Sequence, residues 1–177
     1  GRPRSKSLCT PALDEDTLTM AYEASVGALA GAEVPGTVIT VSQSPPFGLR
    51  KLSATLARTL GLDDAVPLDV GGHPGALLDA LEIAGSLAGE GDPPVLVVVS
   101  DHLVSIDERV CDMLSAGAAA AFLVGASGGF ARLGTTVRAS REVYDVWRLG
   151  TEAEARYRLE VLFDAYGSTT KQALAGL

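Results

Sequence analysis

The run PPVLVVVSD, residues 93–101, constrains the fold of this chain more than any other stretch. Its apolar residues are continuous and do not alternate with polar ones, which is typical of a strand covered on both faces. Two further strand patterns, GTVITVSQ at 36–43 and AVPLDV at 65–70, come before it. Helical patterns separate these strands, so the sequence predicts an α/β layered fold with a mainly parallel sheet.

The helices are predicted from apolar residues at helical spacing. The first begins at the acidic residues 14–16, which favour the start of a helix. The second spans 49–60 and ends at Gly61, and the third follows the glycine turn GGHPG at 71–75. SAGAAAAFLVG at 115–125 predicts one more strand. The segment 152–177 predicts a charged amphipathic helix whose apolar face carries Tyr157, Val161, Leu162 and Ala165.

Composition excludes several classes of protein. The 177 residues suffice for one domain with a sizeable core, and a net charge of -8 disfavours nucleic acid as a partner. The basic residues Arg2, Arg4 and Lys6 are interpreted as a solvated terminal arm.

Cys9 and Cys111 show no metal-ligand spacing, so no metal is expected and a reducing cytoplasm is predicted. The longest apolar run is too short to span a bilayer, so we expect no membrane association.

The simplest division of the chain has three parts. Residues 1–13 form a terminal arm, 14–135 an α/β domain, and 136–177 an extension that ends in the amphipathic helix. No internal repeat and no low-complexity linker interrupts this order.

Four segments in this order resemble the N-terminal half of thiolase-superfamily condensing enzymes. The resemblance is to the 3-hydroxy-3-methylglutaryl-CoA (HMG-CoA) synthase-like branch, followed by the ketoacyl synthase III-like enzymes. The segments are DEDTLTMAYEA at 14–24, SQSPP at 42–46, LDVGGHPGALLDAL at 68–81 and AGAAAAFLVG at 116–125, and YDVWRLG at 144–150 follows them. The resemblance implies one αβαβα thiolase-like half with a mainly parallel mixed sheet and a buried central helix. It also implies that the first strand and nearly all of the second half are missing.

The same resemblance implies that two catalytic groups have been replaced. The family places its nucleophilic cysteine five residues after an aspartate and seven before a leucine, and counting from Asp69 and from Leu81 both lead to Pro74. The family's acid/base glutamate corresponds to Gln43. Proline carries no nucleophile, and a neutral amide does not exchange a proton near neutral pH. The resemblance therefore leaves open whether the chain is an enzyme.

Several other residues are weaker candidates for a role in chemistry or binding. His73 adjoins the nucleophile position and is a weak candidate for a substitute base or nucleophile, because the sequence offers it no acidic partner. His102, at the end of the third strand pattern, and Trp147 are interpreted as structural contacts, and Cys111 as a buried or interface thiol. Ser42, Ser44 and Ser100 lack a nucleophile-elbow pattern. The turn GGHPG lacks the Lys-Ser/Thr of a nucleotide loop.

Three functions remain open. The favoured hypothesis is a non-catalytic thiolase-fold subunit or half-domain that pairs, in a homo- or hetero-oligomer, with a thiolase-like or acyl-CoA-handling protein. Its apolar sheet edge is expected to need such a partner. The alternative is an active acyltransferase or condensing enzyme completed by another chain. A third hypothesis is a module that binds a coenzyme A thioester as ligand without reacting. No cofactor is expected.

Overall fold

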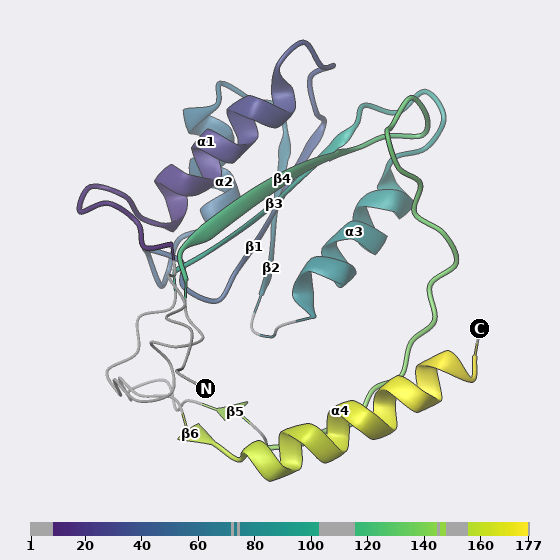
Figure 1. Cartoon of the computed structure of the whole chain (residues 1–177). Coiled ribbons are helices and arrows are strands. Elements are labelled where there is room, and N and C mark those ends of the chain that lie inside the picture. The colour runs from purple at the N-terminus through teal and green to yellow at the C-terminus, as the bar shows by residue number, and fades with distance from the viewer. Residues whose placement is uncertain are drawn as a thin grey trace, which may run out of the picture. The chain divides into compact units, whose positions relative to one another are not determined.

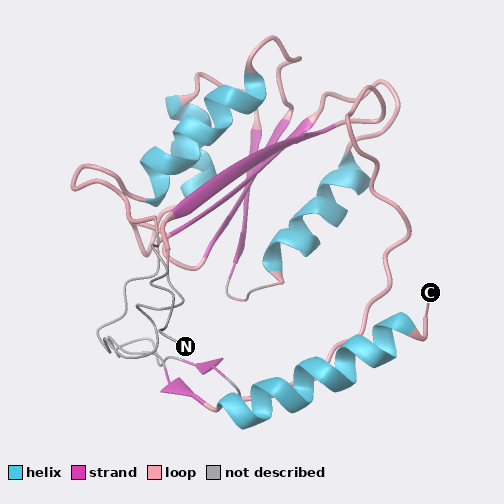
Figure 2. Cartoon of the chain, viewed as in Figure 1, coloured by secondary structure: helices cyan, strands magenta, loops and turns pink. Residues whose placement is uncertain are grey.

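Four strands form a mixed sheet in the order β2-β1-β3-β4 (Figures 1 and 2). They are β1 Thr37–Ser42, β2 Val66–Gly71, β3 Val95–Asp101 and β4 Ala118–Val124. β1 pairs in parallel with both β2 and β3, whereas β4 runs antiparallel to β3. The predicted α/β fold with a mainly parallel sheet is therefore confirmed. β3 lies between two strands, as its unbroken apolar run indicates.

This computed structural model describes residues 9–71, 73, 75–102, 116–144, 146–147 and 156–176. The chain divides into two compact units. The unit that contains the sheet comprises residues 1–104 and 113–131, and the second unit comprises 105–112 and 132–177. We call the first the sheet unit.

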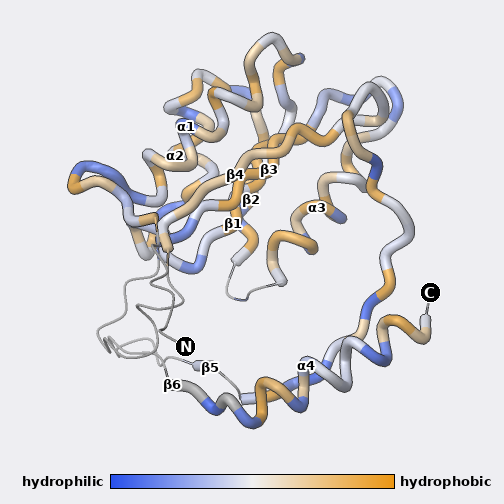
Figure 3. The backbone as a smooth tube through the Cα atoms, in the orientation of Figure 1, coloured by the Kyte–Doolittle hydropathy of each residue, from blue (hydrophilic) through white to orange (hydrophobic). Residues whose placement is uncertain are grey.

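Helices cover both faces of the sheet. α1 Thr17–Leu29 and α2 Leu52–Thr59 lie on one face and α3 Ala76–Leu87 on the other (Figure 1). Side chains alternate along each strand, so each strand supplies two cores. Val38, Leu96 and Val98 pack with α1 and α2, and Ile39, Val41, Val95 and Val97 pack with α3. Figure 3 shows the hydrophobic residues concentrated along these strands.

α3 is packed closely against the sheet by small residues. Ala76, Ala80 and Ala84, spaced at i, i+4 and i+8, have no exposed surface. Away from the sheet, α3 leaves large apolar side chains in solvent, with Leu78 70% exposed and Leu87 44%. The family resemblance implies that α3 is a buried central helix. The described residues of this chain cover only one side of it.

Local chemistry explains where the helices begin and end. Asp16 is the N-cap of α1, and its carboxylate accepts hydrogen bonds from the Leu18 and Thr19 amides, so the helix starts after the acidic residues and not among them. α2 begins at Leu52, three residues later than predicted, because Asp69 from β2 binds its first amides. Gly61 ends α2 with a φ of 72°, as expected of a glycine C-cap.

The second unit contains a short hairpin and a helix. β5 Val146–Trp147 pairs antiparallel with β6 Arg156–Tyr157, and α4 spans Leu159–Leu174. The predicted amphipathic helix is present, but the prediction that Tyr157 lies on it is wrong, because that residue pairs with Val146 in the hairpin. Ala165 of α4 is buried, and the Arg158 guanidinium lies 5.8 Å from the centre of the Trp147 ring.

Candidate functional site

The ends of three parallel strands bring the candidate residues to one edge of the sheet. Ser42 is paired with Gly71, and Val41 with Val99, so the segments that follow β1, β2 and β3 leave the sheet side by side. Ligands of α/β proteins bind at this carboxyl edge. Gln43 follows β1, His73 follows β2, and Asp101 ends β3.

Asp101 holds the turn that carries Gln43. Its Oδ1 atom accepts hydrogen bonds from the Gln43 amide at 2.6 Å, the Ser44 amide at 3.1 Å, the Ser44 hydroxyl at 2.9 Å and the Ser42 hydroxyl at 3.1 Å. A carboxylate accepts stronger hydrogen bonds than a neutral group does. The backbone at Gln43, which the sequence motif predicts to correspond to the family's acid/base glutamate, is therefore fixed by β3.

Ser44 links this turn to two further elements. Its hydroxyl accepts a hydrogen bond from the His102 amide at 2.9 Å, and its carbonyl accepts one from the Thr17 hydroxyl at the start of α1. His102 thus joins the turn through its backbone. This backbone hydrogen bond agrees with the prediction that His102 makes a structural contact. The bond does not involve the imidazole.

Asp69 anchors α2 against the sheet. One oxygen accepts hydrogen bonds from the Thr40 hydroxyl at 2.8 Å and the Ser53 amide at 2.9 Å, and the other accepts one from the Leu52 amide at 3.0 Å. Burial raises the pKa of Asp69, but the hydrogen bonds from Ser53, Thr40 and Leu52 lower it by more, so its pKa lies below the ordinary value. Asp69 is therefore the charged cap of α2.

Gly71 allows β1 and β2 to approach each other at this edge. A Cβ atom on Gly71 would lie 2.9 Å from the Ser42 carbonyl oxygen, a distance that real Cβ atoms essentially never show. Any larger residue would push β2 away from the turn that holds Gln43.

His73 has an acidic partner. Its Nε2 atom lies 3.1 Å from Oδ2 of Asp79, in the first turn of α3, and both side chains are partly exposed. The expectation from sequence that His73 lacks such a partner is wrong, because its ring lies beside Gly75, directly before α3, and reaches Asp79. A carboxylate on one ring nitrogen orients an imidazole and favours the tautomer with the other nitrogen free to accept a proton.

The remaining candidates from the sequence are Pro74, Cys111 and Cys9. Pro74 and Cys111 lie outside the described residues, so the register that places Pro74 at the nucleophile position stays a prediction. Cys9 is exposed, and its carbonyl accepts a hydrogen bond from the Gly117 amide. Among the residues that the structure describes, no cluster of His, Cys, Asp or Glu could hold a metal ion, and no helix is long and apolar enough to cross a membrane.

Sequence reasoning missed the groups that organise the site. The sequence predicts Asp101 only as the end of a strand and uses Asp69 only as a reference for counting to Pro74. It assigns no role to Asp79. A usable signal was present for two of them, because an Asp that ends a buried strand faces the carboxyl edge and is placed to accept hydrogen bonds from neighbouring turns. Nothing in the local sequence predicts the contact of Asp79 with His73.

No family model matches this sequence, but solved structures share its fold. An HMG-CoA synthase complexed with CoA is 18% identical over 91% of this chain and 43% of its own, with a TM-score of 0.79. PksG, an HMG-CoA synthase from Bacillus subtilis, is 20% identical over 95% and 44%, with a TM-score of 0.80. A 3-oxoacyl-(acyl-carrier-protein) synthase III is 20% identical over 94% and 61%, with a TM-score of 0.66.

The chain therefore has the thiolase-like fold of the condensing enzymes. More particularly, it matches the N-terminal half of the HMG-CoA synthases and of the synthase III enzymes. It spans less than half of the length of the HMG-CoA synthases that it matches. The resemblance seen in the sequence motifs is confirmed at the level of the fold.

Proposed function

We propose that this chain is a non-catalytic thiolase-fold half that pairs with a thiolase-like or acyl-CoA-handling protein, as a structural or regulatory partner in an acyl-CoA condensing or acyl-transfer complex. The observation that carries the proposal is the position of β2. This strand leads toward the nucleophile position of the family, and it lies at the edge of the sheet.

The retained scaffold and the replaced groups support the non-catalytic part. Asp101 fixes the backbone at Gln43, so the turn is built although its side chain is an amide that cannot act as an acid or base near neutral pH. Counting along the sequence places Pro74 where the family has its cysteine. In this proposal the backbone of the site is retained, and two of its reactive side chains are replaced by unreactive ones.

The open edge of β2 supports the partner. The Val66 amide donates to the Gly36 carbonyl toward β1, so the alternate residues Pro67, Asp69 and Gly71 turn their backbone groups to the free edge. Pro67 has no amide to offer, and its carbonyl accepts a hydrogen bond from the Lys51 side chain. Asp69 and Gly71 are therefore the residues available for pairing with a partner strand.

A charge at this edge should disrupt the assembly. Val66 is 55% exposed on β2, and Val66→Lys places a cation where a partner strand would pack. We expect wild-type protein at micromolar concentration to elute as an oligomer or with a thiolase-like protein in size-exclusion chromatography with light scattering, and Val66→Lys to elute as a monomer. Val34→Lys, at a residue 69% exposed outside the sheet, is the matched control and should assemble normally. A wild-type protein that is monomeric and carries no thiolase-like protein would refute the pairing.

The His73–Asp79 contact favours a second candidate function. An imidazole oriented by a carboxylate at the start of α3 could accept a proton from a thiol or water, or attack a thioester itself. This is the alternative in which the chain is an active acyltransferase or condensing enzyme completed by another chain.

Acyl-CoA substrates separate the two functions. After incubation with acetyl-CoA or malonyl-CoA, intact-protein mass spectrometry should show no acyl adduct on the wild-type chain and thiol titration should show no CoA release, because proline cannot attack a thioester. Pro74→Cys should gain an acetyl adduct, since it restores a thiol two residues before the first residue of α3. CoA release by the wild type that is lost in both His73→Gln and Asp79→Asn would instead establish the second candidate.

A further inference from the structure

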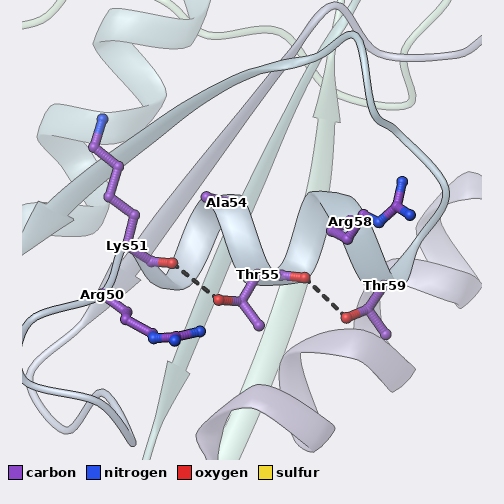
Figure 4. Close-up of a pocket in the computed structure, with 6 residues that line it drawn as sticks. All are labelled: Arg50, Lys51, Ala54, Thr55, Arg58 and Thr59. Atoms are coloured by element: carbon purple, nitrogen blue, oxygen red, sulfur yellow. Dashed lines mark hydrogen bonds between the residues drawn. The ribbon is translucent and has the colours of Figure 1, made fainter.

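A shallow groove runs along the exposed face of α2 (Figure 4). Its volume is about 530 Å³. It is lined by Arg50 and Lys51, directly before α2, and by Ala54, Thr55, Arg58 and Thr59 of α2, which recur at helical spacing. We call it the α2 groove. It has cations at both ends and Ala54 with two threonines between them.

The α2 groove concentrates the positive charge of its unit. Within the described part of the sheet unit, Arg50, Lys51 and Arg58 are the only Lys and Arg residues, although acidic residues are numerous there. Arg58 pairs with Asp63 through Nη1, while Arg50 makes no hydrogen bond or ion pair within the described residues. Although the chain has a net charge of -8, these clustered cations give it a local surface that is complementary to an acidic ligand.

The hydrogen-bond donors of the α2 groove are unsuited to a small phosphate. The amides of Leu52 and Ser53, which could bind an anion at the start of α2, already donate to Asp69. The hydroxyls of Thr55 and Thr59 donate to backbone carbonyls one turn earlier, as Figure 4 shows. Lys51 Nζ donates to the Pro67 carbonyl and Arg58 Nη1 to Asp63. The donors left for a ligand are therefore the guanidinium of Arg50 and the remaining N–H groups of Lys51 and Arg58.

We propose that the α2 groove binds an acidic helical segment of a partner protein. α2 has eight residues and is about 12 Å long at 1.5 Å per residue, with Arg50 and Lys51 directly before it and Arg58 in its last turn. Carboxylates two turns apart on a helix laid along α2 match this length, and a small side chain between them can rest on Ala54. Carboxylates pair well with arginine, which offers several donors in one plane. This surface lies on α2 and not on β2, so the proposal does not depend on the partner proposed above.

A model peptide tests this binding. The probe is a fluorescein-labelled 16-residue helical peptide of alanine with glutamate at every fourth position, followed by fluorescence anisotropy with the full chain. We expect Arg50→Glu to weaken binding at least tenfold, because it replaces attraction by repulsion at one end of the groove. Arg50→Glu combined with Arg58→Glu should abolish binding. Lys171→Glu, the same change on α4, is the matched control and should bind as the wild type does. High salt should weaken the wild-type complex.

Several outcomes would overturn the proposal. Equal affinity of the Arg50→Glu and wild-type chains would do so, as would equal binding of a peptide with lysine in place of glutamate. Displacement of the peptide by inorganic pyrophosphate at a lower concentration than by unlabelled peptide would assign the α2 groove to a phosphate instead. Circular dichroism checks that each variant is folded. If Arg50→Glu fails to fold, peptide binding is measured with Arg50→Gln and Arg58→Gln instead. Their expected loss of affinity is smaller.

Discussion

Replacing Asp101 with alanine is expected to lower the free energy of unfolding by about 2–3 kcal/mol. The carboxylate is the shared acceptor for two amides and two hydroxyls of the turn at 42–44, and its removal leaves these partly buried donors without that acceptor. The loss should appear in urea unfolding followed by circular dichroism. Hydrogen exchange at the Gln43 and Ser44 amides should also become faster.

Asp101→Asn is the matched control for this prediction. Asparagine keeps an acceptor oxygen in the same place but removes the charge, so its cost should be clearly smaller than that of alanine. Equal stability of the alanine variant and the wild type would mean that water replaces Asp101 at no cost. The claim that β3 fixes the backbone at Gln43 would then fail.

Replacing Asp69 with alanine is expected to lower the free energy of unfolding by about 2–4 kcal/mol. The change removes the cap of α2 and leaves the hydroxyl of Thr40, which is 2% exposed, without its acceptor. Thermal and urea unfolding measure this loss. Because α2 would lose its fixed start, the α2 amides should show the largest increase in hydrogen exchange.

The contribution of Asp69 should also depend on pH. Its folded-state pKa lies below the ordinary value, so its stabilisation is fully present above the unfolded pKa of about 3.9 and is lost as pH falls through the folded pKa. The difference in unfolding free energy between the wild type and Asp69→Asn should therefore be large near neutral pH and shrink in acid. A difference that stays constant over this range would show that the charge of Asp69 contributes nothing.

The sequence predicted the layers of this fold well because those layers follow from local pattern. Continuous apolar residues mark β3, and apolar residues at helical spacing mark α3. The start of α2 was predicted too early because its cap, Asp69, is supplied by a strand that comes later in the chain. Tyr157 was placed on a helix because its spacing fits one, although strand pairing with Val146 takes precedence.

The site was harder to predict than the fold. Gln43 and His73 were found from their position relative to motifs, yet the residues that hold them were not. Asp101 is 58 residues from Gln43 in the chain, and their contact exists only because β1 and β3 are neighbours in the sheet. His73 and Asp79 are close in sequence, but their contact depends on where the His73 ring lies relative to the first turn of α3. Neither relation has a local sequence signature.

The bond between Thr40 and Asp69 has a consequence for strand register. These residues are direct partners in the pairing of β1 with β2, and their side chains meet on the face that carries α2. A slip of one residue would turn Asp69 toward the α3 side, away from both Thr40 and the start of α2. The carboxylate of Asp69 therefore favours the observed alignment of β1 and β2 over a one-residue slip. The same alignment places Gly71 beside Ser42, and therefore decides which residues meet at the carboxyl edge.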